Sequence, residues 1–141
     1  MRNVESLDCI LLIDDDRPTN FIHKKTIMSM GLDTHIQVCE SGQDALDYLN
    51  CEGTFSEEKS FPQPGVVFLD INMPGMNGWD FLEHYHHLPE NRKAKIIVAM
   101  LTTSSNPDDK ERVDKDSAVK TIYSKPLKHE YLEEIIETYF S

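Results

Sequence analysis

The sequence predicts an α/β fold in which five short strands alternate with five helices. Short apolar runs alternate along the whole chain with stretches of helical length. The central run, Val66–Leu69, has no alternation of apolar and polar residues, as is typical of a strand covered on both faces. It ends in an acid, Asp70, and regular structure just beyond is prevented by Pro74, Gly75 and Gly78.

Five apolar runs are the expected strands, and four of them end in polar side chains. The runs are Cys9–Ile13, Ile36–Cys39, Val66–Leu69, Ile96–Leu101 and Val119–Tyr123. Parallel strands joined by helices form a doubly wound sheet, and five such units usually take the strand order 2-1-3-4-5. We therefore expect a flavodoxin-like (βα)5 sheet with helices on both faces.

The expected helices begin at capping residues. Asp16 is expected to cap the first helix, a structural role that we favour for it, Pro18 lies near the first helical position, and Gly31 is expected to end the helix. The apolar residues of this helix are Phe21, Ile22, Ile27, Met28 and Met30. The later helices are expected to begin near Ser41, Trp79, Asn106 and Leu127. Trp79 and the methionine pair Met28 and Met30 are expected to pack rather than to bind a cofactor.

Polar side chains converge on one edge of this sheet. Ligand sites in open α/β sheets lie outside the carboxyl ends of the strands. There the chain places three acids, a threonine and a lysine, which in chain order are Asp14, Asp15, Asp70, Thr102 or Thr103, and Lys125. Several carboxylates crowded together suit a hard divalent cation that keeps several waters, so we expect Mg²⁺. Asp70 would then be the nucleophile in phosphoryl transfer, and Lys125 a fixed positive charge.

At these residues the chain resembles bacterial response-regulator receiver domains of the stand-alone, chemotaxis-regulator-like type. Four separated motifs carry the resemblance, in the order Leu12–Asp15, Leu69–Gly78, Leu101–Ser104 and Ser124–Pro126. The resemblance covers nearly the whole chain and implies a single receiver domain over 1–141, with a core of about 8–140. The polar segment 50–64 is expected to be a mobile loop.

The resemblance also implies a role for each site residue. Asp70 would be the phospho-acceptor that becomes 4-aspartylphosphate, and Lys125 would contact the phosphoryl group. Asp15 would bind Mg²⁺ directly, Asp14 mainly through water, and Asn72 through its carbonyl group. The peptide bond between Lys125 and the following proline would be cis.

Two positions depart from the common pattern of the family. Receivers usually carry one switch hydroxyl after the fourth strand, where this chain has both Thr102 and Thr103. We favour Thr103, because the small residue Ser104 follows it. An aromatic residue is usual three positions before the lysine, where this chain has Ile122, and Tyr123 comes one position late. A strand would point Tyr123 to the opposite face.

The function implied is two-component signalling. The chain would accept a phosphoryl group from a sensor histidine kinase or a histidine phosphotransfer protein, and then change its affinity for an unknown downstream protein. By family analogy, that partner would contact the face made by the fourth helix, the fifth strand and the fifth helix, around Asp108–Asp116 and Val119–Tyr123. We expect no enzyme activity beyond self-catalysed phosphorylation and dephosphorylation, and a monomer or weak dimer.

Two other functions remain open from the residues. The run from Asp14 to Asp16 also fits the start of haloacid-dehalogenase-like phosphatases, with Asp14 as nucleophile and Asp16 as acid and base. Pro18 and the lack of a cap domain count against this alternative. The third function is a docking module that works without phosphorylation.

Composition excludes several classes of partner. The 141 residues include 14 basic and 25 acidic side chains, and the net charge of −11 disfavours binding to nucleic acids and anionic membranes. No membrane span or signal peptide is evident, so we expect a cytoplasmic protein. The cysteines have no metal-ligand spacing and are expected to be reduced thiols: Cys9, Cys39 and Cys51. The spacing of three histidines does not fit one helical face, so we expect solvated surface at His84, His86 and His87.

Overall fold

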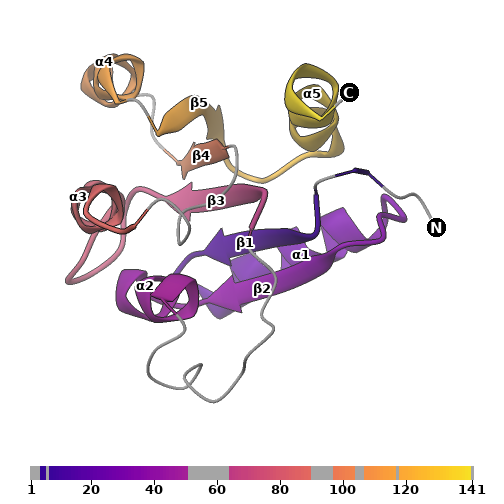
Figure 1. Ribbon diagram of the computed structural model, residues 1–141, viewed down its shortest axis with the longest axis horizontal. Helices are drawn as coiled ribbons and strands as arrows, with labels where there is room; N and C mark the ends of the chain where they lie inside the picture. The colour runs from indigo at the N-terminus through magenta and orange to yellow at the C-terminus, as the bar shows by residue number, and fades with distance from the viewer. Residues whose placement is uncertain are drawn as a thin grey trace.

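Five parallel strands form one sheet in the order β2-β1-β3-β4-β5 (Figure 1), which confirms the predicted fold and strand order. The computed structural model describes residues 4–5, 7–50, 64–89, 97–103, 107–116 and 118–140. The strands are β1 (Cys9–Ile13), β2 (His35–Cys39), β3 (Val66–Asp70), β4 (Ile97–Thr102) and β5 (Val119–Ser124).

Helices cover both faces of the sheet, as expected. They are α1 (Arg17–Met28), α2 (Gly42–Asn50), α3 (Gly78–His86), α4 (Pro107–Lys115) and α5 (His129–Tyr139). Helices α1 and α5 lie on one face, and α2, α3 and α4 on the other (Figure 1). None of the described helices combines the length and the apolar character that a membrane crossing requires.

Successive strand residues alternate between two hydrophobic cores. The α1/α5 core contains Leu12, Phe68 and Leu101, together with Leu132, Ile135 and Ile136 of α5. The α2/α3 core contains the neighbouring strand residues Leu11, Leu69 and Met100, together with Phe81 and Leu82 of α3. Every residue of β1 and β3 is buried. This burial explains why β1 is a continuous apolar run in the sequence and why β3 is an apolar run that ends in an acid.

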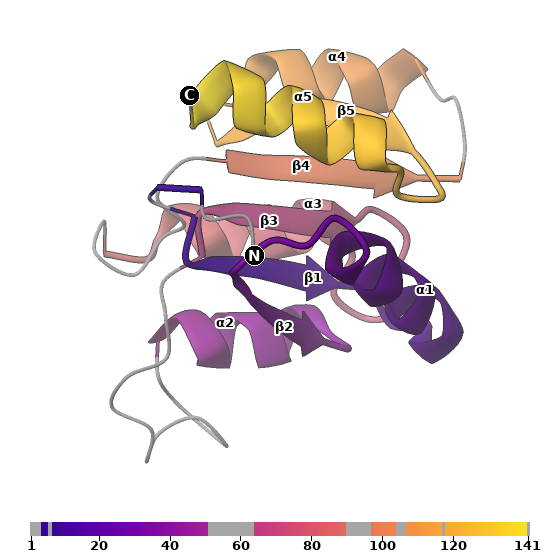
Figure 2. The same cartoon turned by 90° about the vertical axis from the view of Figure 1, so that its right-hand side faces the viewer.

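The strands run in the same direction, so their carboxyl ends share one edge of the sheet (Figure 2). The register aligns Ile13 with Leu69, Asp70 with Leu101, and Thr102 with Ser124. This alignment places the polar residues that follow β1, β3, β4 and β5 at one rim.

Helix α1 buries two polar residues and leaves several of its apolar residues exposed. Its buried residues are Asn20, His23 and Ile27. More than half of the side-chain surface is exposed at Phe21, Ile22 and Met28. The expectation that Met28 packs was therefore wrong. Two polar residues can take the inner face because they make hydrogen bonds there, as described below.

Most of the expected caps are present. The Asp16 side chain accepts the Thr19 amide at 3.1 Å at the start of α1, and Ser41 Oγ accepts the Asp44 amide at 3.0 Å at the start of α2. Gly31 follows α1 with a positive φ of 70°, as a helix-ending glycine often does. Gly78 was expected to disrupt regular structure, but it is the first residue of α3.

Some expectations lie outside the described residues. They concern most of the predicted loop 50–64, together with Cys51, Ile96, Ser104 and the cap Asn106. Cys9 and Cys39 are buried free thiols, as expected.

Candidate functional site

Three acids meet at the rim formed by β1 and β3. Asp70 is the last residue of β3, and Asp14 and Asp15 directly follow β1. One carboxylate oxygen from each of the three lies within 4.8 Å of the other two. Asp14 and Asp70 are 3% and 4% exposed, whereas Asp15 is exposed to solvent. The predicted convergence of these acids is thus present in the fold.

Lys125, directly after β5, reaches into the acidic group. Its ammonium nitrogen lies 2.6 Å from Asp14 Oδ2 and 3.1 Å from Asp70 Oδ1. The Lys125 amide donates to the carbonyl of Thr102 at 2.8 Å, which ties its loop to the end of β4. The bond between Lys125 and Pro126 is cis, as the resemblance implied.

Burial and charge shift the pKa values of this group. The pKa of Asp70 is raised because burial disfavours the carboxylate and Asp14 adds a second negative charge, although Lys125 opposes both. Burial alone would lower the pKa of Lys125. Its hydrogen bond to Asp14 and the charges of both acids outweigh burial, so the pKa of Lys125 is raised. Lys125 is therefore a permanent cation at neutral pH.

Backbone groups hold the acids in place. Asp14 Oδ1 accepts the Asp16 amide at 3.0 Å, and Asp70 Oδ1 accepts the Asn72 amide at 3.3 Å. Gly78 packs directly against the end of β3, because an added Cβ would lie 2.7 Å from the Asp70 carbonyl oxygen. The glycine is needed for this close approach, a role that sequence reasoning missed.

The donor set fits a hard divalent cation. It offers carboxylate oxygens from Asp14, Asp15 and Asp70, and oxygen is the ligand that Mg²⁺ and Mn²⁺ prefer. Exposed Asp15 leaves room for water on the outer side. Lys125 neutralises part of the negative charge, but the three carboxylates carry more negative charge than one lysine can neutralise.

The two candidate threonines differ in environment. Thr102 is 4% exposed and belongs to β4, whereas Thr103 follows the strand and is exposed. Asp70 comes two residues after Phe68 of the α1/α5 core, and Thr103 comes two residues after Leu101 of the same core. Because side chains alternate between the two faces of a strand, Thr102 at the end of β4 lies on the opposite face from Asp70, whereas a continued strand would place Thr103 on the face of Asp70.

Tyr123 lies on the face expected for it. It packs against the α1/α5 core, whereas Ile122 packs against the α2/α3 core. The Tyr123 ring stacks on Tyr131 of α5 with 4.1 Å between centroids, and its hydroxyl donates to Glu134 at 3.2 Å. Burial and the nearby Glu134 charge raise the pKa of Tyr123 to about 12.

Asp16 belongs to the helix and not to the acidic group. Its carboxylate accepts both the amide and the hydroxyl of Thr19, and these bonds lower its pKa. Asp16 therefore caps α1, as predicted, and its lowered pKa makes it a poor general acid, which counts against the phosphatase alternative.

Two buried polar residues of α1 were missed from the sequence. Asn20 Nδ2 donates to the carbonyl of Asp14 at 2.7 Å, and His23 Nε2 accepts the amide of Leu127 at 3.2 Å. Asn20, His23 and Ile27 follow the spacing of one helical face, but two of the three are polar, so apolar periodicity does not indicate that this face is buried.

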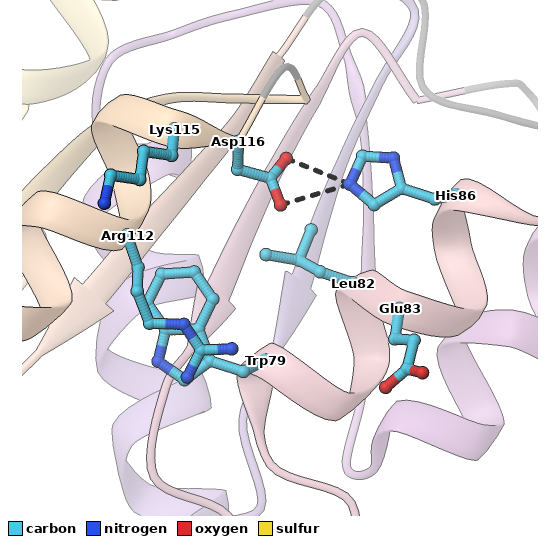
Figure 3. Close-up of a pocket in the computed structure, with 7 residues that line it drawn as sticks. All are labelled: Trp79, Leu82, Glu83, His86, Arg112, Lys115 and Asp116. Atoms are coloured by element: carbon cyan, nitrogen blue, oxygen red, sulfur yellow. Dashed lines mark hydrogen bonds and ion pairs between the residues drawn. The ribbon is translucent and has the colours of Figure 1, made fainter.

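A cleft of about 450 Å³ lies between α3 and α4 and includes none of the three acids (Figure 3). The guanidinium of Arg112 lies 4.2 Å from the ring centroid of Trp79, whose Nε1 donates to Asp109 at 3.2 Å. His86 Nε2 lies 3.0 Å from an oxygen of Asp116. The expectation of a merely solvated His86 was incomplete, because it links α3 to the end of α4. His84 in α3 and His87, directly after the helix, are exposed, as expected.

Comparison with known proteins assigns the family. A family model for the response regulator receiver domain matches residues 10–137. Response regulator Rcp1 from Synechocystis is 27% identical over 71% of this chain, and the match spans 65% of Rcp1. A two-component response regulator structure from Cytophaga hutchinsonii has a TM-score of 0.80 and 32% identity, covering 94% of this chain and 96% of that one. A Mn²⁺-bound form of Rcp1, 24% identical with a TM-score of 0.72 and covering 94% and 93%, shares the fold. The chain belongs to the response regulator receiver domain family.

Proposed function

We propose that this receiver domain accepts a phosphoryl group on Asp70 from a phosphohistidine and thereby changes its affinity for a partner protein. The observation that carries the proposal is the position of the Asp70 carboxylate, at a strand end beside two further acids and the Lys125 ammonium. The donor would be a sensor histidine kinase or a histidine phosphotransfer protein, as is usual in this family.

In the transfer, an Asp70 carboxylate oxygen attacks phosphorus. A P–O bond forms, the P–N bond to the histidine breaks, and the imidazole leaves with the bonding electron pair and takes up a proton. Lys125 holds Asp70 in place before transfer and offers its ammonium to the phosphoryl oxygens afterwards. With a small phosphodonor the same attack would give self-catalysed phosphorylation.

A divalent cation, Mg²⁺ in our proposal, would be held by Asp14, Asp15 and Asp70 together with the carbonyl of Asn72. It would neutralise negative charge on the phosphoryl oxygens. The oxygen-only donor set supports this, and so does the fold neighbour Rcp1, which has a Mn²⁺-bound form. The protein's own contribution is to fix Asp14 through the Asp16 amide and Asp70 through the Asn72 amide.

Phosphorylation would change which groups form hydrogen bonds at the rim. An acyl phosphate brings more negative charge and three acceptor oxygens, which attract Lys125 away from Asp14 and attract the hydroxyl of Thr103. Thr103 is the favoured switch residue because it directly follows β4 and is accessible, whereas Thr102 is buried.

Helix α4 is suited to carry the response to the downstream partner. Its one buried residue in the described structure is Val113, so little apolar packing opposes its movement. Trp79 directly follows Gly78 at the Asp70 carbonyl and bonds Asp109 in the first turn of α4. We propose the face of α4, β5 and α5 as the surface that the partner reads, in a monomer or weak dimer.

Intact mass after incubation with Mg²⁺ and acetyl phosphate tests the proposal. The wild-type chain should gain one phosphoryl group, and Asp70→Asn or removal of Mg²⁺ by a chelator should prevent it. Asp47→Asn, which removes an acid from α2, is the matched control and should label normally. Full labelling of Asp70→Asn would overturn the proposal. Continuous hydrolysis of the donor by Asp70→Asn would instead indicate a phosphatase.

A further inference from the structure

The inner face of α1 is polar where a helix usually buries apolar side chains. Asn20 is 4% exposed and His23 is 2% exposed, while Phe21 on the outer face is 61% exposed. Burying polar groups is favourable only where they find hydrogen-bond partners. The partners of these two residues belong to the loop that carries Asp14 and Asp15 and to the loop that carries Lys125.

His23 holds the loop that follows β5. Its Nε2 accepts the amide of Leu127 at 3.2 Å, two residues after Lys125. Asn20, one helical turn earlier, donates to the Asp14 carbonyl at 2.7 Å and so holds the loop that follows β1. One rigid helix therefore fixes both Asp14 and Lys125, whose side chains lie 2.6 Å apart.

The bond requires a particular form of the histidine. Accepting an amide proton at Nε2 needs a free lone pair there, so the ring is neutral with its proton on Nδ1. Burial lowers the pKa of His23 and favours this neutral form. An apolar residue of similar size could fill the space, but the amide of Leu127 would lose its acceptor.

We infer that His23 is a positioning residue for phosphoryl transfer: by accepting the Leu127 amide it fixes the loop that places the Lys125 ammonium between Asp14 and Asp70. The inference rests on the proposed function and adds a residue that does not itself touch the phosphoryl group. His23 acts through Lys125, so its effect should depend on that lysine.

The test compares labelling rates with acetyl phosphate and Mg²⁺ for variants at this position. Gln places an oxygen acceptor close to the position of His Nε2, whereas Asn is one methylene shorter and does not reach it. His23→Gln should label within about twofold of wild type, and His23→Asn and His23→Leu about tenfold more slowly, because small displacements of a reacting group have large effects. Lys24→Gln, on the exposed side of the same helix, is the control and should label normally.

A second set of variants separates positioning from simple damage to the fold. In a Lys125→Ala background, His23→Leu should slow labelling by less than about twofold further, since residues acting through one contact are not additive. If His23→Leu fails to fold, the comparison of His23→Gln with His23→Asn is sufficient to test the inference.

The outcomes separate the inference from the proposed function. A wild-type chain that is not labelled on Asp70 overturns the proposed function. If the wild type is labelled, any of three results would overturn the inference alone. His23→Leu could be labelled as fast as the wild type, His23→Gln could be as slow as His23→Asn, or His23→Leu could still slow labelling fully in the Lys125→Ala background.

Discussion

The ammonium nitrogen of Lys125 lies 2.6 Å from Oδ2 of Asp14, although the two residues are 111 positions apart in the sequence. The same nitrogen is 3.1 Å from Asp70, and both contacts are largely shielded from solvent. Lys125 therefore already occupies the place between the acids where positive charge is most needed. A bound divalent cation would take over part of this role.

The first prediction concerns the neutralisation of the buried acids, a role that Lys125 and a bound cation would share. Lys125→Met leaves two buried acids without their cation and should lower the free energy of unfolding in a chelating buffer by on the order of 3 kcal/mol. Mg²⁺ should restore more stability to the variant than to the wild type, because it binds only the folded site. Urea unfolding with and without Mg²⁺ measures both effects. An equal loss under the two conditions would show that the lysine and the metal act independently, and Lys24→Met is the control.

A second prediction separates Mg²⁺ binding from the stability of the fold. Asp15 is exposed and makes no side-chain bond with any other residue that the structure describes. Asp15→Asn should therefore not lower the free energy of unfolding without Mg²⁺. It should weaken Mg²⁺ affinity at least about tenfold, the scale that even indirect changes at metal sites produce. Isothermal titration measures the affinity. Asp33→Asn makes the same charge change at another exposed acid, and a similar loss there would refute the assignment of Asp15.

The fold and the acidic rim were predictable because both follow from local patterns. Asp70 ends an apolar run and Lys125 follows another, and parallel strands bring all such ends to one edge. Caps such as Asp16 were equally predictable, since a capping bond joins residues three positions apart.

The inner face of α1 was not predictable in the same way. Apolar periodicity favours Phe21 and Met28 as buried residues, but the structure buries Asn20 and His23. Their burial depends on partners far away in the sequence, as with His23 and Leu127, 104 positions apart. Hydropathy patterns contain no information about such a bond. The same limit applies to Gly78, whose importance comes from its contact with the Asp70 carbonyl.

A third prediction distinguishes the two threonines. Thr103→Ala should still be labelled by a small phosphodonor, but phosphorylation should no longer shift the amide resonances of α4, because the hydroxyl that would bond the phosphoryl group is absent. Thr102→Ala removes a buried side chain and should lower stability by about 1 kcal/mol, with the shifts of α4 retained. Nuclear magnetic resonance before and after labelling measures both. The reverse pattern would assign the switch to Thr102.

A fourth prediction follows from the buried thiols. Burial raises the pKa of Cys9 to about 11 and that of Cys39 to about 12, from 9.0. Above pH 9 the unfolded chain loses these protons before the folded chain does, so stability is full below pH 9 and is lost as pH rises toward the folded values. Each thiol should contribute about 1.4 kcal/mol of loss per pH unit in this window.

Comparison of wild type with Cys39→Ala isolates the thiol contribution, since tyrosines and lysines titrate equally in both chains. Unfolding midpoints between pH 9.5 and 10.5 should fall less steeply in Cys39→Ala. Identical slopes would mean that the Cys39 thiol is not shielded in solution.

The last prediction uses two glycines that each begin a helix. A Cβ at Gly78 would lie 2.7 Å from the Asp70 carbonyl oxygen and 2.9 Å from the Ile71 Cα, and this backbone cannot move without shifting Asp70. Gly78→Ala should lower the free energy of unfolding by about 2 kcal/mol and slow labelling of Asp70 about tenfold. A Cβ at Gly42 would meet the sulfur of Met76 at 2.5 Å, which is the flexible end of a side chain and can turn away.

Gly42→Ala is therefore the matched control, and its free energy of unfolding should stay within about 0.5 kcal/mol of wild type, with labelling unchanged. Urea unfolding and the time course of the mass shift measure the pair. The comparison separates the helix preference for alanine, which both variants share, from displacement of the Asp70 backbone, which only Gly78→Ala causes. Equal labelling rates in the two variants would show that the Asp70 carboxylate tolerates movement of its own backbone, and that the tight packing of Gly78 serves the fold alone.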